Sequence, residues 1–359
     1  MPYRIPIGPF HPALEEPYKL GVSCEGETVR EVAIEVGFSF RAIELLAQKR
    51  NYLQGLTLVE RVCGICSGVH TLTFCMAVEV LAGLEVPPRA NAIRVIVAEL
   101  ERLHSHLLWA GIAAEDLGFQ SLFMEVFALR ERIMDVLELI SGNRVHYAMN
   151  CIGGVNRDLR ESDSVLAAVR QVRRDLERDV VPVLTTDPIV RARTRGVGTL
   201  ERQQAIGYGV VGPTARASGV DADVRRDQPY AAYAELGVRV ATAERGDVEA
   251  RILVRALEML ESIRLVEEAL RRLPSGAIRA GTGIPTVPPG EATARSEAPR
   301  GELFYYLASD GSDTPTRVKI RTPTFVNIPA VEAMCLGQHL ADMPIIQASV
   351  DPCCSCTDR

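Results

Sequence analysis

The amino-acid sequence predicts an α+β fold that is mainly α and has a small β portion. Three observations support this prediction. Four long stretches between residues 90 and 273 repeat apolar side chains every three or four positions, which is typical of helices packed in a core. One stretch near the N-terminus alternates apolar and polar residues, as strands do. Segments rich in glycine and proline interrupt the helical patterns.

The β portion is predicted at residues 18–38. Apolar and polar residues alternate on both sides of Glu25-Gly26-Glu27, and a glycine between two short alternating runs indicates a β-hairpin with a short turn. We expect the sheet content of the protein to be concentrated here.

The helical portion is predicted to be a bundle. Two of the periodic stretches end near Gly118 and Gly142, and glycine commonly follows the last turn of a helix. Helices joined in this way bury their apolar faces against one another, so we expect a long-helix bundle. Glycine- and proline-rich residues 207–233 and 273–300 are predicted to be ordered loops. The predicted helices are 90–118, 122–142, 163–184 and 247–273.

The composition excludes several classes of protein. The formal net charge is -6 and no basic stripe with interleaved aromatic residues occurs, so nucleic acid is not expected as a partner. No apolar run approaches the roughly 20 residues that cross a bilayer, and the N-terminus lacks an export signal. We therefore expect a cytoplasmic protein whose attachment to a membrane would need partner subunits.

Two of the cysteine groups have the spacing of metal ligands. Cys63 and Cys66 form one CxxC pair, and Cys353 and Cys356 form another at the opposite end of the chain. Four thiolates suit zinc, iron or nickel. The pairs of a local zinc knuckle usually lie about 12 to 20 residues apart, which disfavours a knuckle here, although spacing alone leaves structural zinc open. A thioredoxin-like redox pair is also disfavoured, since neither CxxC opens a helix in a βαβ pattern.

The same pairs bear on domain organisation. The sequence contains no internal repeat, and a site built from both cysteine pairs would join the two ends of the chain. We therefore expect a single domain over residues 1–359. It would consist of a β-rich segment at about 1–45, a helical core at about 46–272 and a C-terminal segment at about 273–359 that returns to the metal site.

The flanks of the cysteine pairs resemble a known family. RVCGICSGVH at 61–70 together with DPCCSCTDR at 351–359 is similar to the paired signatures of nickel-iron hydrogenase large subunits. Residues 8–17, 209–233 and 297–330 look like the membrane-associated, energy-converting group related to the 49 kDa subunit of complex I. That group includes ferredoxin-, carbon-monoxide- and formate-linked hydrogenases. The resemblance covers essentially the whole chain and implies the nickel-iron hydrogenase large-subunit fold.

The resemblance implies the cofactor and the reaction. It places a nickel-iron centre on the four cysteines, with Cys63 and Cys353 as terminal nickel ligands and Cys66 and Cys356 bridging nickel and iron. Iron in this family also carries carbon monoxide and cyanide. The implied activity is the reversible reduction of protons to dihydrogen.

Further site residues are implied by matching positions. Glu16 stands where the family has its proton-relay glutamate, and neighbouring Glu15 is the competing candidate. Arg300 matches an arginine over the open side of the metals, where its fixed charge and donors hold the cyanide ligand. Asp351 is expected to orient this arginine, and His70 to donate a hydrogen bond to a bridging sulfur.

One position departs from many soluble members of the family. They hold magnesium with a histidine three residues after the last cysteine, and the residue here is Arg359. Arginine stays protonated and cannot be a metal ligand. We predict that its guanidinium replaces the ion and pairs with Glu44 or a neighbouring carboxylate.

The resemblance also implies partners. No third cysteine group in the sequence could bind an iron-sulfur cluster, so a small hydrogenase subunit must carry one. Further ferredoxin-like and membrane ion-transport subunits would hold the chain on the cytoplasmic face of the membrane, with ferredoxin as electron donor. We also expect that a C-terminal extension after Arg359 is clipped on metal insertion.

Two other functions stay open at this point. A complex I-like quinone-reducing subunit shares the fold but lacks the four cysteines, so their presence favours a hydrogenase. A non-catalytic scaffold with structural zinc would contain zinc without nickel or iron.

Overall fold

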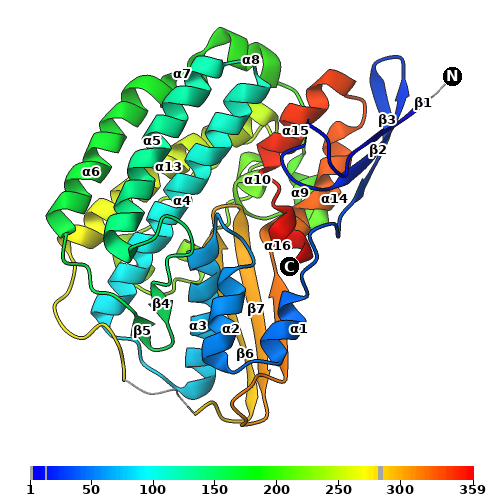
Figure 1. Ribbon diagram of the computed structural model, residues 1–359. Helices are drawn as coiled ribbons and strands as arrows, with labels where there is room; N and C mark the ends of the chain where they lie inside the picture. Colours follow the sequence, from blue (N-terminus) through cyan, green and yellow to red (C-terminus); the bar gives the residue numbers. More distant parts are fainter. Residues whose placement is uncertain (1–2, 13, 282–285) are drawn as a thin grey trace.

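The structure of the protein, a computed structural model, describes residues 3–12, 14–281 and 286–359. A bundle of long helices forms one side of the molecule, and two three-stranded antiparallel sheets lie on the other side (Figure 1). The predicted α+β class with a helical majority is confirmed.

The bundle is built from four helices that pack side by side (Figure 1). The bounds of three predicted helices agree with the observed bounds to within a few residues. The fourth, predicted at 163–184, is helical throughout, but a π-helical turn over Leu176–Val180 divides it into α6 and α7. Pro182, near the start of the next helix, has no N–H to continue the hydrogen-bond ladder. The four helices are α4 (Pro88–Asp116), α5 (Gln120–Ser141), α6 (Ser162–Asp175) and α13 (Val248–Arg271).

Helix α4 is buried around its whole circumference. It packs against α5, α13 and α15 (Met343–Val350), and also contacts β5 (Gly154–Val155). The interpretation of this stretch as an amphipathic helix is therefore wrong, because charged residues also point into the core. They are compensated there by partners, as buried charges must be. The buried charged or titratable side chains of α4 are Arg94, Glu99, Glu101, Arg102, His104 and His106.

The predicted N-terminal hairpin is confirmed. Strands β2 (Lys19–Glu25) and β3 (Thr28–Glu35) pair in antiparallel register, with Glu25 opposite Thr28. Gly26 in the turn has φ 61°, a conformation that glycine adopts without steric cost. Strand β1 (Tyr3–Ile7), which the sequence pattern did not predict, adds to the free edge of β2.

A second sheet corrects the expectation that strands are concentrated near the N-terminus. Strand β7 lies between β6 and β8. The prediction of a loop over 273–300 is wrong from residue 290 onward. The inward-facing positions of β6 include Ala292, Ala294 and Ser296, which are too small or too polar to give a visible apolar alternation. The strands of this sheet are β6 (Gly290–Ala298), β7 (Gly301–Ser309) and β8 (Arg317–Arg321).

Short elements complete the fold and bring the chain ends together. Helix α3 packs on β6 and β7, while α14 contacts both β3 and α16. Residues 207–233, predicted as a loop, contain short helices. The remaining elements are α1 (Ile43–Gln48), α2 (Tyr52–Glu60), α3 (Ser67–Ala82), β4 (Asn150–Cys151), α7 (Val181–Thr186), α8 (Pro188–Thr194), α9 (Arg202–Tyr208), α10 (Gly212–Ala217), α11 (Val224–Asp227), α12 (Tyr233–Leu236), α14 (Pro323–Cys335), a 3₁₀ turn (Leu340–Asp342) and α16 (Cys354–Asp358).

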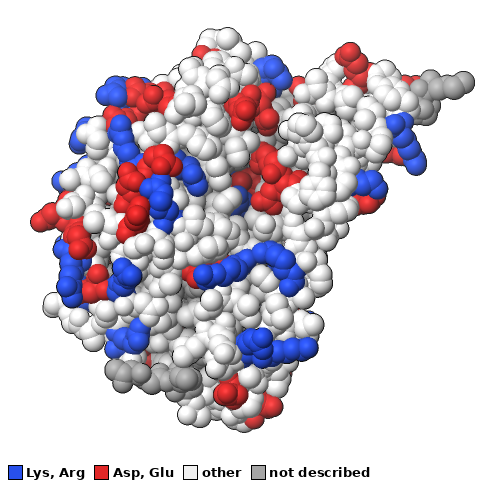
Figure 2. All heavy atoms as spheres, in the orientation of Figure 1, with Lys and Arg blue, Asp and Glu red and all other residues white. Residues whose placement is uncertain are grey.

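The surface carries charges of both signs. On the face shown in Figure 2, acidic and basic side chains are interspersed over the helical side of the molecule. Arg144, for example, lies within ion-pair distance of Glu131, Asp135 and Glu138. Among the described residues, no helix combines the length and apolarity that crossing a membrane requires.

Candidate metal centre

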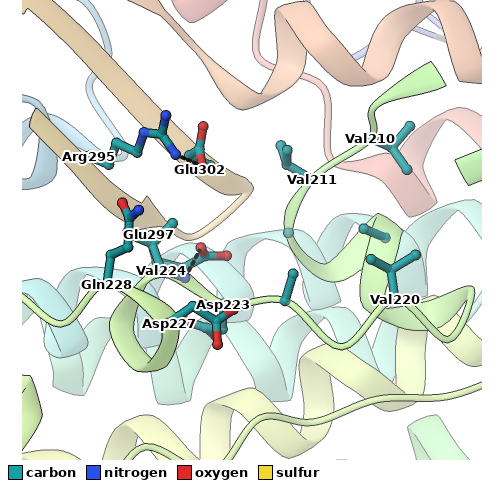
Figure 3. Close-up of a pocket in the computed structure, with 13 residues that line it drawn as sticks. Val210, Val211, Val220, Asp223, Val224, Asp227, Gln228, Arg295, Glu297 and Glu302 are labelled. Carbon is teal, nitrogen blue, oxygen red and sulfur yellow. Dashed lines mark hydrogen bonds and ion pairs between the residues drawn. The ribbon is translucent and has the colours of Figure 1, made fainter. Parts of the chain in front are cut away.

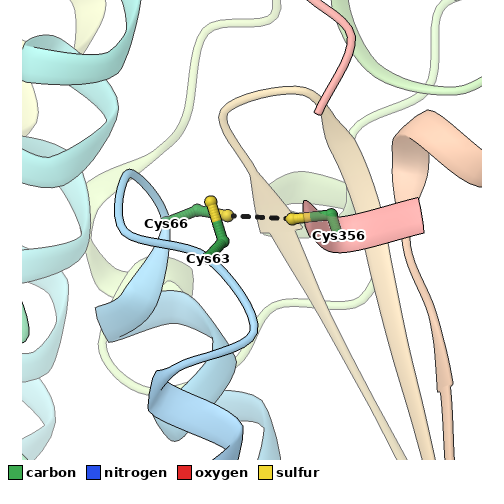
Figure 4. Close-up of side chains that lie close together, drawn as sticks. All are labelled: Cys63, Cys66 and Cys356. Carbon is green, nitrogen blue, oxygen red and sulfur yellow. Dashed lines mark hydrogen bonds between the residues drawn. The ribbon is translucent and has the colours of Figure 1, made fainter. Parts of the chain in front are cut away.

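The two cysteine pairs meet in the interior of the protein. Cys63 and Cys66 lie on the loop between α2 and α3, whereas Cys353 immediately precedes α16 and Cys356 lies within it. The Sγ atoms of Cys63 and Cys353 are 3.6 Å apart, as are those of Cys66 and Cys356. Figure 4 shows the sulfurs of Cys63, Cys66 and Cys356 pointing toward one another, all within 4.8 Å.

These four thiols form a ligand set for a soft or borderline metal. All four cysteines are at most 3% exposed. Two sulfurs bound to one ion at about 2.3 Å in tetrahedral directions lie about 3.8 Å apart, close to the observed separations. Hydrogen bonds from the other three thiols lower the pKa of Cys63 well below its usual value, whereas the pKa values of Cys66, Cys353 and Cys356 are raised, so the four thiols share one thiolate.

Helix α4 holds the first cysteine loop from behind. The Glu101 carboxylate accepts hydrogen bonds from the backbone N–H groups of Gly68 (2.6 Å) and Val69 (2.9 Å), which begin α3 and have no partner within the helix. One turn further along α4, His104 Nε2 lies 3.0 Å from the carbonyl oxygen of Ile65, between the two cysteines. Sequence reasoning missed both residues, because a single buried acid or histidine in a helix has no distinctive spacing.

His70 lies beside the cluster, as a residue that could tune it. Its Nε2 is 3.6 Å from the sulfur of Cys356, and its Nδ1 is 2.7 Å from the hydroxyl of Tyr305 on β7. Burial lowers the pKa of His70 to about 4, so the ring is neutral near pH 7 and carries one proton. If Tyr305 donates to Nδ1, that proton is on Nε2 and faces the sulfur.

Buried neutral histidines give an expected pH dependence of stability. Burial lowers the pKa of His104 to about 3, whereas the unfolded side chain takes up a proton near pH 6.5. The unfolded state therefore binds more protons between these values. His104 therefore contributes stability that is complete above pH 6.5 and is lost as the pH falls toward 3, at about 1.4 kcal/mol per pH unit.

Urea unfolding of wild-type and His104→Gln protein between pH 4 and 7 measures this contribution. Glutamine retains a donor for the Ile65 carbonyl but does not titrate, so the variant should show a shallower loss of stability at low pH. Parallel curves for the two proteins would contradict the assignment.

Arg300 and Asp351 form a buried ion pair next to the cysteines. Arg300 Nη2 is 2.8 Å from Asp351 Oδ1, and its Nε donates to the Asp351 carbonyl at 2.8 Å. Within the described part of the chain, Arg300 Nη1 and Asp351 Oδ2 are buried without a hydrogen-bond partner. Unpaired buried donors and acceptors are costly, so a further group is expected to complete their hydrogen bonding.

The turn that carries Arg300 is fixed by close backbone packing. A Cβ atom on Gly212 would lie 2.3 Å from the carbonyl oxygen of Arg300, and one on Gly301 would lie 2.7 Å from the Gly212 nitrogen. Only glycine permits this approach. Arg102 of α4 donates to the carbonyl of Ala298 at 3.0 Å, which anchors the end of β6.

The glycine-rich segment 209–233 also builds an ionic network beneath this turn. Arg216 binds Glu297 at 2.8 Å and Glu258 at 2.8 Å, and all three side chains are buried. Figure 3 shows Glu297 and Asp223 at a cavity of about 290 Å³, with the backbone N–H of Val224 donating to Glu297 at 3.1 Å. The charged side chains that line this cavity are already paired. The network holds Glu297, near the end of β6, and so supports the β6–β7 turn.

Glu16 contacts the second cysteine segment. Its Oε2 accepts hydrogen bonds from the backbone N–H groups of Cys354 and Ser355, the latter at 3.1 Å. Burial raises the pKa of Glu16; Arg300 and the two N–H donors oppose this rise and Cys63 adds to it, leaving the pKa above its ordinary value. The adjacent Glu15 has an exposed side chain that lines a surface pocket with Asp116, but desolvation of its carboxyl group raises its pKa to about 8.

The C-terminal arginine is paired as predicted. Arg359 Nε lies 2.7 Å from Glu44 Oε1, and Lys319 Nζ lies 3.2 Å from the same atom. The backbone N–H of Ile320 also donates to this oxygen at 3.0 Å. Burial raises the pKa of Glu44, but the hydrogen bonds from these groups outweigh it and lower the pKa overall, so the carboxylate is charged.

This pairing predicts indifference to magnesium. Because two cations already neutralise Glu44, adding Mg²⁺ to chelator-treated protein should leave the melting temperature unchanged. Arg359→Ala should lower the free energy of unfolding by about 1.5–3 kcal/mol, the range for hydrogen bonds to charged groups. Arg317→Ala, which removes an exposed arginine of the same pocket, is the matched control. A Mg²⁺-dependent rise in the wild-type melting temperature would contradict this description.

Two family models match the sequence. The model described as "Respiratory-chain NADH dehydrogenase, 49 Kd subunit" matches residues 116–284 and 281–359. The model described as "Nickel-dependent hydrogenase" matches residues 41–110, which include the first cysteine pair.

Individual relatives match over nearly the full length. The chain is 45% identical to the carbon monoxide-induced hydrogenase of Rhodospirillum rubrum, over 99% of both chains. It is 42% identical to the membrane-bound hydrogenase subunit alpha of Pyrococcus furiosus, over 99% of this chain and 87% of the relative. Among solved structures, a chain of the membrane-bound sulfane sulfur reductase, an archaeal respiratory membrane complex, superposes with a TM-score of 0.94. That chain is 34% identical, and the match covers 99% of this chain and 98% of the other.

Proposed function

Since the chain belongs to the hydrogenase group related to the 49 kDa subunit of respiratory-chain NADH dehydrogenase, we propose that it is the catalytic subunit of a multisubunit nickel-iron hydrogenase. The proposed reaction is the reversible reduction of two protons by two electrons to dihydrogen. The observation that carries this proposal is the meeting of four buried cysteine thiols from the two ends of the chain.

The residues present fit a nickel-iron pair. Four sulfurs suit these metals, and the two observed 3.6 Å contacts group Cys63 with Cys353 and Cys66 with Cys356. This is the division proposed for terminal nickel ligands and for bridging ligands, respectively. The unpartnered Arg300 Nη1 is a buried donor beside the cysteines, as a cyanide ligand on iron would require.

The side chains around the sulfurs have separate proposed roles. The bound metal pair would supply the two-electron chemistry. Glu16 would carry the proton, because its carboxyl contacts the second cysteine segment and burial raises its pKa, which favours the protonated form. Arg300 would present a fixed positive charge at the open side of the metals, and Asp351 would orient its guanidinium. His70 would donate a hydrogen bond to the Cys356 sulfur.

Electrons must enter from a partner. In the described part of the chain, the other five cysteines are separate buried residues, so we propose that a small subunit carries the nearest iron-sulfur cluster. Ferredoxin as donor, and membrane subunits that couple turnover to ion transport, complete the proposed assembly. The chain would then sit at the cytoplasmic face of the membrane; relatives whose names describe membrane-bound complexes support this placement.

Hydrogen production by the purified complex tests the proposal. Under anaerobic conditions, reduced viologen should drive dihydrogen evolution that requires nickel in the preparation. Quinone reduction without nickel would instead identify a complex I-like subunit, and zinc without either activity would identify a scaffold. Each of these two results would overturn the proposal.

A further inference from the structure

One short segment touches both cysteine motifs. Arg41, which precedes α1, donates from Nη1 to the carbonyl of Arg61 at 2.6 Å and from Nη2 to the carbonyl of Val62 at 3.0 Å. The same Nη2 donates to the carbonyl of Ser355 at 2.6 Å. Arg61 and Val62 directly precede Cys63, and Ser355 directly precedes Cys356. One guanidinium therefore connects the backbone beside a cysteine of each pair.

The backbone just before Arg41 makes a second link to the C-terminal motif. Asp358 accepts hydrogen bonds from the N–H groups of Gly37 at 2.8 Å and Ser39 at 2.7 Å. Arg41 Nε in turn donates to the carbonyl of Ser39 at 3.1 Å, which fixes the side chain against its own segment. Residues 37–41, called the clamp segment below, are thus tied to α16 at two places.

The other polar contacts hold one motif at a time. His104 binds the first cysteine loop, whereas Glu16 and Thr324 bind only the second. Cysteine thiols aside, Arg41 is the one side chain among the described residues that hydrogen-bonds to both residues 61–66 and residues 351–359. No described carboxylate lies within ion-pair distance of it, so its donors serve backbone carbonyls.

We propose that Arg41 is a positioning residue that holds the two cysteine pairs at ligand distance and so retards loss of the metal. This inference rests on the proposed function. The planar guanidinium can serve several carbonyls in fixed directions, which the point charge of a lysine ammonium cannot do as well. The alternative is that Arg41 is an exposed arginine whose hydrogen bonds to loop carbonyls do not affect the positions of the cysteines.

The test compares Arg41→Gln and Arg41→Lys with the wild type in the purified complex. Arg41 is exposed, so its replacement leaves no cavity in the core. Arg50→Gln is the matched control, because Arg50 is exposed on the nearby α1–α2 connection and, among the described residues, its guanidinium donates only to the neighbouring Lys49 carbonyl. Nickel is followed after addition of a chelator, together with the infrared bands of the centre and the melting temperature.

We expect nickel release from Arg41→Gln to be about 10- to 100-fold faster than from the wild type, the range for residues that support metal ligands. Arg41→Lys should be intermediate, Arg50→Gln should match the wild type, and the melting temperature should change little. Wild-type release rates in Arg41→Gln would overturn the proposal.

A second readout does not depend on nickel. In metal-depleted protein, iodoacetamide labelling of Cys63 and Cys356, mapped by peptide mass spectrometry, should be about tenfold faster in Arg41→Gln, since local opening exposes the thiols. Unchanged labelling would also overturn the proposal that Arg41 holds the two cysteine pairs together. Wild-type protein without nickel would refute the proposed hydrogenase function, and the labelling rates would still decide the role of Arg41.

Discussion

Replacement of Cys353 with serine is expected to abolish hydrogen production and to remove nickel from a chain that still folds. The Cys353 sulfur lies 3.6 Å from that of Cys63 in the buried cluster. A serine hydroxyl is a harder ligand and does not ionise near neutral pH, so it cannot replace a thiolate on nickel. Loss of nickel affinity should exceed about 100-fold, the upper range for residues that only support ligands.

Nickel content, hydrogen production and the melting temperature of the variant measure this effect. The matched control is Cys75→Ser, which changes a fully buried cysteine on α3 outside the two CxxC pairs. It should retain nickel even if the buried hydroxyl lowers stability. A Cys353→Ser protein with wild-type nickel content and activity would show that this thiol is not a ligand.

Replacement of Glu16 with glutamine is expected to lower the rate of hydrogen turnover by about 10²- to 10⁴-fold, the usual contribution of general acid-base catalysis. A glutamine side-chain oxygen can still accept the N–H bonds from Cys354 and Ser355, so the geometry of the second cysteine segment should persist. What the variant loses is the exchangeable carboxyl proton. Nickel content and infrared bands should therefore resemble those of the wild type.

Glu15→Gln is the discriminating control for this prediction. Glu15 is adjacent in sequence but exposed, and none of the hydrogen bonds to the cysteine segments involves it in the described structure. We expect its turnover to stay within a few-fold of the wild type. Loss of turnover in Glu15→Gln with normal turnover in Glu16→Gln would transfer the relay role to Glu15.

The helical part of the fold could be predicted well from local pattern, and the failures have physical causes. The hairpin at β2 and β3 has alternating apolar residues and a glycine turn, so the sequence pattern was enough to predict it. Strand β6 was missed because its buried face uses Ala292, Ala294 and Ser296. Helix α4 was predicted to have a solvated charged face, but its charged residues are paired in the core.

Some residues of the candidate site could likewise be predicted from the sequence, and others could not. The cysteines, Glu16 and Arg300 stand in motifs that resemble a family, so the sequence was enough to propose them. His104 and Arg41 could not be found in this way, because they act on backbone carbonyls supplied by distant segments. Hydrogen bonds to the backbone impose no residue type on the partner and leave no spacing pattern in the sequence.

Infrared spectroscopy of the purified protein, combined with quantification of nickel and iron, tests the central claim most directly. A nickel-iron centre held by the four cysteines should give bands in the carbon monoxide and cyanide stretching region, with nickel and iron both present in proportion to the chain. Absence of these bands in a folded preparation that contains zinc instead would contradict the assignment of the protein as a hydrogenase.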